Sequence, residues 1–159
     1  RGEEGVISAF LGSDGKGGKH LECPALPLKN AFTNNNDSEI KESYLSMNGR
    51  EIFKFAVKII VESVNKVFEA SGMLLDEIKF IVPHQANIRI IDSAAKKLGI
   101  SSERFYVNLD KYGNTSGASI PIALDEMAKG GLLNKGDKII LVGFGAGLTY
   151  GAELIKWTK

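Results

Sequence analysis

The order of apolar patterns after residue 48 constrains the fold more than any other feature of the sequence. Apolar residues recur at three- and four-residue steps through residues 49–71, which predicts a long amphipathic helix. Shorter helices are predicted over residues 88–98 and 116–129, because each of these patterns ends at a glycine. Runs typical of short strands lie between and after the helices, at residues 78–82, 105–108, 138–144 and 149–157.

This alternation of helix and strand predicts a layered α/β domain. Parallel strands joined by right-handed helical crossovers account for the earlier strands, and a hairpin at the edge of the sheet accounts for the last two. Ligands of such sheets bind beyond the carboxyl ends of the strands. We therefore expect functional side chains at residues 83–85, after residue 108, and at residues 144–147.

The beginning of the chain follows a different pattern. An apolar run at residues 6–11 predicts a strand, the glycines of residues 12–18 predict a turn, and residues 20–23 are predicted to be the returning strand. Residues 25–37, which include three consecutive asparagines, are predicted to form a loop.

Composition excludes several classes of protein. The 159 residues carry a net charge of +1, which gives no overall attraction to nucleic acid or to a membrane surface. No apolar run reaches the roughly 18 residues that a membrane span needs, and the first residues show no signal-peptide pattern. The single cysteine, Cys23, cannot form an internal disulfide, which favours a reducing, cytoplasmic setting.

Two polar motifs follow predicted strands. His84, within residues 83–87, stands where a strand gives way to a helix, and its imidazole can donate a hydrogen bond to a substrate oxygen. Asn114, within residues 112–119, has an amide that donates as well as accepts. Together the two side chains would form a clamp on one carbonyl oxygen, which is the principle of an oxyanion hole. Each motif also has a purely structural interpretation, as a helix entry or a helix cap.

The third motif, residues 143–147, contains three glycines between two apolar strands. Such a turn can direct backbone N–H groups at an anion, or it can simply close a hairpin. It lacks the following helix and the Lys-Ser/Thr pair of a phosphate-binding P-loop.

Taken together, the three motifs resemble one family. Pro-His-Gln-Ala-Asn, then Tyr-Gly-Asn-Thr-Ser-Gly-Ala-Ser, then Gly-Phe-Gly-Ala-Gly-Leu-Thr-Tyr-Gly resemble the β-ketoacyl-acyl-carrier-protein synthase III family of the thiolase superfamily. The resemblance implies a thiolase-like α/β/α fold, of which this chain would be the C-terminal half. It also implies closing strands of the N-terminal half plus a linker in residues 1–30, and a C-terminal domain in residues 31–159.

The resemblance implies a function for the motif residues. The family joins a short acyl-CoA to malonyl-acyl carrier protein with loss of carbon dioxide, and so initiates fatty-acid synthesis. His84 and Asn114 would hold the malonyl thioester carbonyl during decarboxylation. The backbone N–H of Ala146, where the family often has glycine, would serve the acylation oxyanion hole, with Phe144 beside it. Ala is compatible with this role if its φ angle is negative.

The resemblance also implies binding residues. Asn87 would contact the pantetheine arm of CoA, and Gly49 and Arg50 would lie near the CoA entrance, although the family often has Asn where Arg50 stands. The acidic carrier protein would dock on the helix after His84, through Gln85, Ala86, Asn87, Ile88, Arg89, Lys96 and Lys97. On charge alone these residues would be an ordinary solvated helix face. No metal or cofactor is implied, since CoA and carrier-protein thioesters are substrates.

The family's nucleophilic cysteine lies in the N-terminal half, and Cys23 does not match it. We interpret Cys23 as a packing residue and His20 as a surface turn residue. The chain alone is therefore expected not to condense acyl groups, whereas a parent containing both halves would do so as a homodimer.

Two alternatives stay open at this point. The chain could be a non-catalytic domain that binds carrier protein or CoA, or part of another condensing enzyme of the superfamily, such as a chalcone-synthase-like enzyme. A nucleotide-binding α/β domain is disfavoured, because the glycine loop joins strand to strand.

Overall fold

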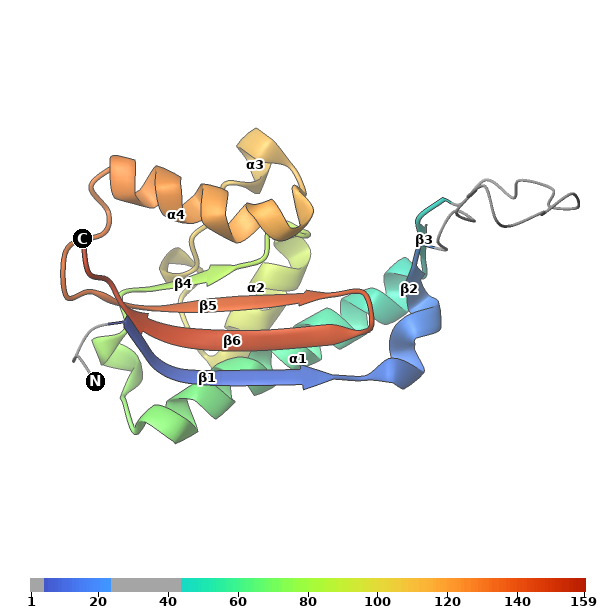
Figure 1. Ribbon diagram of the computed structural model, residues 1–159, viewed down its shortest axis with the longest axis horizontal. Coiled ribbons are helices and arrows are strands. Elements are labelled where there is room, and N and C mark those ends of the chain that lie inside the picture. Colours follow the sequence, from blue (N-terminus) through green and yellow to red (C-terminus); the bar gives the residue numbers. More distant parts are fainter. Residues whose placement is uncertain (1–4, 24–43) are drawn as a thin grey trace, which may run out of the picture.

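The computed structural model describes residues 5–23 and 44–159 as a sheet with helices on both faces (Figure 1). The strands are β1 (Gly5–Ser13), β2 (Leu21–Glu22), β3 (Ser46–Met47), β4 (Phe80–Pro83), β5 (Lys138–Gly145) and β6 (Thr149–Lys156). The α-helices are α1 (Gly49–Ser71), α2 (Ile88–Leu98), α3 (Leu109–Tyr112) and α4 (Ser119–Lys129). Short 3₁₀ helices are η1 (Gly15–His20), η2 (Leu75–Glu77), η3 (Ser102–Arg104) and η4 (Ser116–Ala118).

The main sheet has the strand order β1-β6-β5-β4. β4 and β5 are parallel, while β5 and β6 form an antiparallel hairpin. β6 is not an edge strand, because β1 pairs with it antiparallel from Gly5 to Ser13. The predicted hairpin is therefore confirmed, but its place at the edge of the sheet is wrong.

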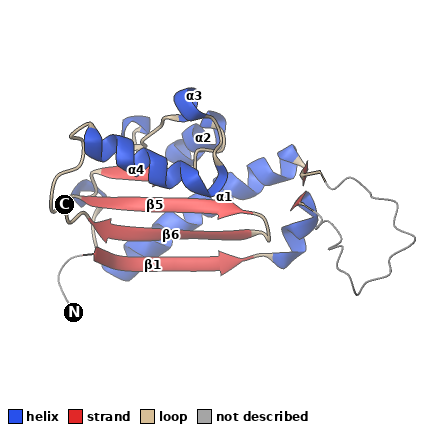
Figure 2. Cartoon of the chain, turned by 45° about the horizontal axis from the view of Figure 1, so that its top comes forward, coloured by secondary structure: helices blue, strands red, loops and turns tan. Residues whose placement is uncertain are grey.

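Side chains of β4 and β5 are buried on both faces of the sheet, because successive side chains along a strand point to opposite faces. Ile81, Ile140 and Val142 pack in one core with α1 and α2, whereas Val82 and Ile139 pack in a second core with α4. Figure 2 shows α1 and α4 on opposite sides of the strands. This helix–sheet–helix layering confirms the predicted α/β/α class.

The helices predicted over residues 49–71 and 88–98 begin and end where their sequences indicate, whereas the helix predicted over residues 116–129 is η4 followed by α4. The Asn48 side chain accepts a hydrogen bond from the Glu51 N–H at 3.2 Å and so caps the start of α1. Gly72 ends α1 and Gly99 ends α2, both with left-handed backbone angles that suit glycine. α2 begins at the Asn87 cap, and its buried residues are Ile90, Ile91, Ala94 and Ala95.

The start of the chain corrects one prediction, the returning strand at residues 20–23. Residues 20–23 do not return alongside β1: residues 15–20 form η1, and β2 pairs with β3. Asp14 explains this path, because it exchanges two backbone hydrogen bonds with Leu148 and its carboxylate caps η1 through the Lys16 N–H. β1 pairs with β6, so residues 5–13 lie in the same sheet as residues 138–156, and the predicted domain boundary at residue 30 stays a prediction. That boundary and the loop predicted at residues 25–37 lie outside the described residues.

The strand predicted at residues 105–108 is reduced to one parallel bridge between Ile81 and Phe105. The buried Gln85 side chain replaces the rest of the ladder, because it bonds the backbone of Tyr106 and Asn108. The segment thus follows β4 without becoming a full strand.

Candidate active site at the carboxyl ends of the strands

His84 extends the parallel pairing one residue beyond the end of β4. Its N–H donates to the Val142 carbonyl of β5 at 2.8 Å, which fixes its backbone at the carboxyl edge of the sheet. The side chain is half-buried. The structure therefore places the predicted histidine where ligands of open α/β sheets bind.

Two neighbours hold the imidazole ring. Nδ1 lies 2.7 Å from the Oγ of Ser119, the first residue of α4. The Phe144 ring packs edge-on against the imidazole, with 5.4 Å between centroids and 69° between planes. Burial lowers the pKa of His84 below the ordinary histidine value, so the neutral ring is favoured.

Phe144 belongs to a small aromatic group beside the histidine. Phe55 of α1 makes edge contacts with both Phe144, at 6.5 Å, and Tyr150 of β6, at 5.9 Å. Phe144 was predicted to line the site, whereas Phe55 was not singled out in the sequence analysis. Its neighbours at this end of the sheet come from strands almost 90 residues later in the chain, so no local signal marks Phe55.

Asn114 lies between α3 and η4, directly after Gly113, whose φ of +67° requires glycine or a strained residue. Its Oδ1 accepts a hydrogen bond from the Ser116 N–H at 3.0 Å, which orients the exposed amide. Within the described residues, no hydrogen bond or ring contact joins Asn114 to His84. Their link is indirect, because Ser119, which contacts His84, follows Asn114 by five residues.

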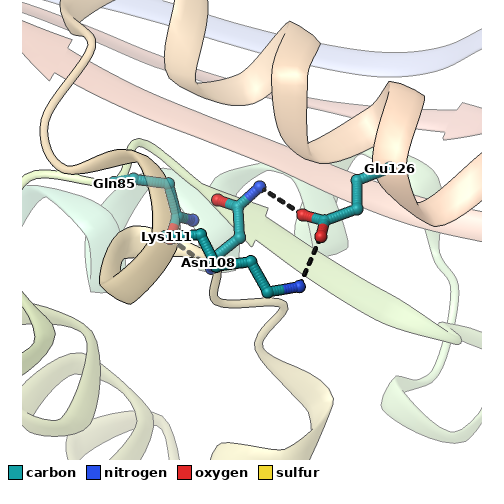
Figure 3. A network of polar contacts seen from close by, with 4 residues as sticks. All are labelled: Gln85, Asn108, Lys111 and Glu126. Atoms are coloured by element: carbon teal, nitrogen blue, oxygen red, sulfur yellow. Dashed lines mark hydrogen bonds and ion pairs between the residues drawn. The ribbon is translucent and has the colours of Figure 1, made fainter.

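A network of polar contacts supports the segment that leads to Asn114 (Figure 3). Gln85, only 1% exposed, donates through Nε2 to the carbonyls of Pro83 and Tyr106, at 2.8 and 3.1 Å, and accepts from the Asn108 N–H at 3.1 Å. The Glu126 carboxylate of α4 then accepts from Asn108 Nδ2 at 2.8 Å and from Lys111 Nζ at 2.5 Å.

This network has an electrostatic consequence. The Lys111 ammonium and the Asn108 amide hold the pKa of the Glu126 carboxyl below its ordinary value, so the carboxylate stays charged. Sequence reasoning missed Asn108, Glu126 and Ser119 as supporting residues. The available signal was weak: the polar Asn108 at the end of one predicted strand, and a hydroxyl residue at the start of the last helix.

The glycine turn lies between β5 and β6. Ala146 is exposed, and Ser116 is the only non-glycine residue with positive φ among the described residues, so the condition set for alanine at position 146 is met. Gly147 has a φ of +133°, where a side chain would also clash with Thr149. The turn thus presents its backbone to solvent at the same end of the sheet as His84.

The predicted carrier-docking residues divide into three groups by their exposure to solvent. Asn87, Ile88, Arg89, Lys96 and Lys97 are exposed on or beside α2, and Asn87 Oδ1 caps the helix by accepting from the Arg89 N–H at 2.9 Å. Ala86 is half-buried. Gln85 is buried and uses its amide internally, so the prediction that it binds a carrier protein is wrong.

The remaining predicted residues lie at the start of the chain and of α1. Gly49 and Arg50 are exposed in the first turn of α1. Cys23 is exposed, so its interpretation as a packing residue is wrong. His20 is half-buried at the end of η1 rather than in a turn. None of the described helices is long and apolar enough to cross a membrane.

Comparison with known proteins gives one consistent result. The family model described as 3-oxoacyl-[acyl-carrier-protein (ACP)] synthase III C terminal matches residues 68–157. A β-ketoacyl-[acyl-carrier-protein] synthase III from Clostridium acetobutylicum is 58% identical over 157 residues, which cover 99% of this chain and 48% of that protein.

Solved structures agree with the sequence matches. A β-ketoacyl-[acyl carrier protein] synthase III from Thermus thermophilus matches with a TM-score of 0.85 and 43% identity, covering 99% of this chain and 47% of that one. A 3-oxoacyl-(acyl carrier protein) synthase III from Pseudomonas aeruginosa PAO1 matches with a TM-score of 0.85 and 36% identity, covering 99% and 46%. This chain spans about half the length of these relatives. It belongs to the 3-oxoacyl-[acyl-carrier-protein] synthase III family, whose C-terminal part it matches.

Proposed function

We propose that this chain is the part of a condensing enzyme that decarboxylates malonyl-acyl carrier protein. The observation that carries the proposal is the placement of His84: a half-buried imidazole held against Ser119 and Phe144 at the carboxyl edge of the sheet. The relatives' names, which specify a 3-oxoacyl-carrier-protein synthase, support the same reaction.

In this proposal His84 and Asn114 hold the thioester carbonyl of the malonyl group. The bond to the carboxylate carbon breaks, carbon dioxide leaves, and the electron pair moves onto the thioester oxygen as an enolate. Hydrogen bonds from Nε2–H of His84 and Nδ2–H of Asn114 stabilise that negative charge. The Asn114 amide suits this role, because Oδ1 is already engaged by the Ser116 N–H and Nδ2 keeps its donors.

Condensation needs a second half of the protein. A short acyl-CoA would first acylate a cysteine of the preceding half, and the Ala146 N–H would stabilise the oxyanion of that step. The enolate carbon would then attack the acyl group carried on the cysteine and displace the thiolate. Asn87, Gly49 and Arg50 would contact CoA near the entrance. The exposed Cys23 is not proposed as the nucleophile, and the complete enzyme is proposed to act as a cytoplasmic homodimer in fatty-acid synthesis.

The decarboxylation step gives the decisive test. In the full-length polypeptide that contains this sequence, His84→Ala and Asn114→Ala are each expected to lower malonyl-carrier-protein decarboxylation by about 10²–10³-fold, the usual effect of removing one oxyanion donor. Asn134→Ala is the matched control, since Asn134 is an exposed loop asparagine in the turn before β5. Full decarboxylation by His84→Ala would refute the proposal.

The chain on its own is expected to lack condensing activity. Mixed with acyl-CoA and malonyl carrier protein, the purified 159-residue chain should yield no ketoacyl product, because the proposed acyl-bearing cysteine is in the other half. Sustained product formation would contradict that assignment.

The exposed face of α2 is proposed to dock the carrier protein. Arg89 and Lys96 are seven residues apart and so share a face of the helix, with Lys97 beside them. Charge reversal by Arg89→Glu is expected to slow association with an acidic carrier protein, and more so at low salt. Lys159→Glu removes the same charge from an exposed position outside α2 and should leave the association rate unchanged.

A further inference from the structure

We propose that Ser119 is a positioning residue that donates its hydroxyl hydrogen to Nδ1 of His84 and so holds the imidazole in the tautomer protonated on Nε2. The proposal rests on the proposed function, because it specifies which ring nitrogen carries the proton that the enolate oxygen meets.

The contacts of the Ser119 hydroxyl decide the direction of the hydrogen bond. Its Oγ lies 3.3 Å from the Gln85 backbone nitrogen, whose N–H donates to it, and 2.7 Å from His84 Nδ1. A backbone N–H can only donate, so this bond uses one lone pair of the serine oxygen. The serine hydrogen is therefore the group that still needs a partner.

Ser119 is only 2% exposed, so solvent does not readily supply that partner. Within the described residues, His84 Nδ1 is the one hydrogen-bond acceptor that the Ser119 side chain meets. A buried hydroxyl whose hydrogen is left unbonded is destabilising, and native structures avoid it. If Nδ1 carried the proton, both ring and backbone would donate to Oγ, and the serine hydrogen would be left without an acceptor.

The favoured arrangement therefore has a bare Nδ1 and a protonated Nε2. Because the neutral ring carries only one N–H, this tautomer leaves the Nε2 donor available to a substrate oxygen. Hydrogen bonds thus run in one direction toward the site: the Gln85 N–H donates to Ser119, the Ser119 O–H donates to His84 Nδ1, and His84 Nε2–H faces the substrate. Gln85 is itself fixed by its three side-chain bonds, so the chain begins from a rigid point.

The tautomer can be read without measuring activity. Long-range ¹H–¹⁵N correlation spectra of the ¹⁵N-labelled full-length polypeptide distinguish a protonated ring nitrogen from a bare one. At about pH 8.5, two units above the ordinary histidine pKa, we expect a bare Nδ1 and a protonated Nε2 for His84, assigned by their loss in His84→Gln. A protonated Nδ1 in the wild-type protein would overturn the proposal.

Ser119→Ala tests the consequence for the reaction. Without the hydroxyl, signal from the Nδ1-protonated tautomer should appear, and decarboxylation should fall roughly three- to tenfold, as expected for one lost neutral hydrogen bond. Ser63→Ala is the matched control: Ser63 is also fully buried, its hydroxyl bonds no group in the described part of the chain, and its loss should change neither readout.

The outcomes separate the two proposals. If Ser119→Ala leaves both tautomer and rate unchanged in an enzyme whose decarboxylation depends on His84, Ser119 has no positioning role. If the wild-type tautomer is as expected but decarboxylation does not depend on His84, the proposed function fails and the Ser119 assignment stands.

Discussion

Replacing Gln85 by leucine should destabilise the protein far more than a single polar-to-apolar change usually does. Gln85 is the buried residue whose amide joins the end of β4 to the segment that replaces a strand at residues 105–108. Leucine has a similar size, so packing is largely kept. The three backbone partners lose their hydrogen bonds together.

The magnitude follows from the burial of those partners. The Pro83 carbonyl and the Asn108 N–H lie in buried residues, and each costs about 1–3 kcal/mol when left unbonded. The Tyr106 carbonyl belongs to a half-buried residue and can recruit water at smaller cost. After about 1 kcal/mol is subtracted for the better burial of leucine, the free energy of unfolding should fall by about 3 kcal/mol.

Thermal denaturation and hydrogen exchange measure this effect in the full-length polypeptide. A loss of about 3 kcal/mol corresponds to a Tm lower by roughly 6–12 °C in a unit of this size. The Asn108 amide should be protected from exchange in the wild-type protein and lose that protection in Gln85→Leu. An unchanged Tm with full Asn108 protection would refute the reasoning. Ser63→Ala, which removes a buried hydroxyl that no described residue bonds, should leave the Tm unchanged or raise it.

Other predictions concern titration and capping. Because burial lowers the pKa of His84, the unfolded chain binds this proton more tightly than the folded protein does. The contribution of His84 to the free energy of unfolding is therefore fully present above the pKa of the unfolded chain, about 6.5. It is lost as the pH falls through the lower pKa of the folded protein. An NMR titration of the His84 ring with a midpoint above about pH 6.5 would contradict the predicted downward shift of its pKa. Asn48→Ala removes the α1 cap and should lower the free energy of unfolding by about 1 kcal/mol, measured by urea denaturation.

Local patterns predicted α1 and α2 well because these two helices carry their own boundaries. Asn48 and Asn87 have side chains that cap the first turns, while Gly72 and Gly99 supply the left-handed ends. These features act over three or four residues and are visible in the sequence. The same holds for the hairpin of β5 and β6, whose glycine turn separates two apolar runs.

Pairings between distant segments were not predictable in this way. Residues 20–23 look like a returning strand. Backbone bonds between Asp14 and Leu148, 134 residues apart, precede η1 instead, and β2 then pairs with β3. Likewise, residues 105–108 have the composition of a strand. The Gln85 side chain, however, bonds the Tyr106 carbonyl and the Asn108 N–H, which a neighbouring strand would otherwise bond. In both places a tertiary contact overrides the local pattern.

The candidate site divides in the same way. The motifs identified His84 and Asn114, but a linear motif does not show which residue holds the imidazole or the amide. Ser119 occurs in the same motif as Asn114, and only the folded chain brings its hydroxyl within 2.7 Å of Nδ1. Cys23 shows the opposite limit: a residue beside an apolar run was expected to pack, and it is exposed.

α4 supports both proposed donors from a single element. Its first residue, Ser119, contacts the His84 ring, and Glu126, two turns later, bonds Asn108 and Lys111 at the start of α3, which leads to Asn114. A helix rises by a fixed 1.5 Å per residue, so these two contacts lie at a set spacing along a rigid body. A displacement of α4 would therefore move Ser119 and Glu126, which support His84 and Asn114, together. The two donors would keep their relative positions, as a site with two donors on one oxygen requires.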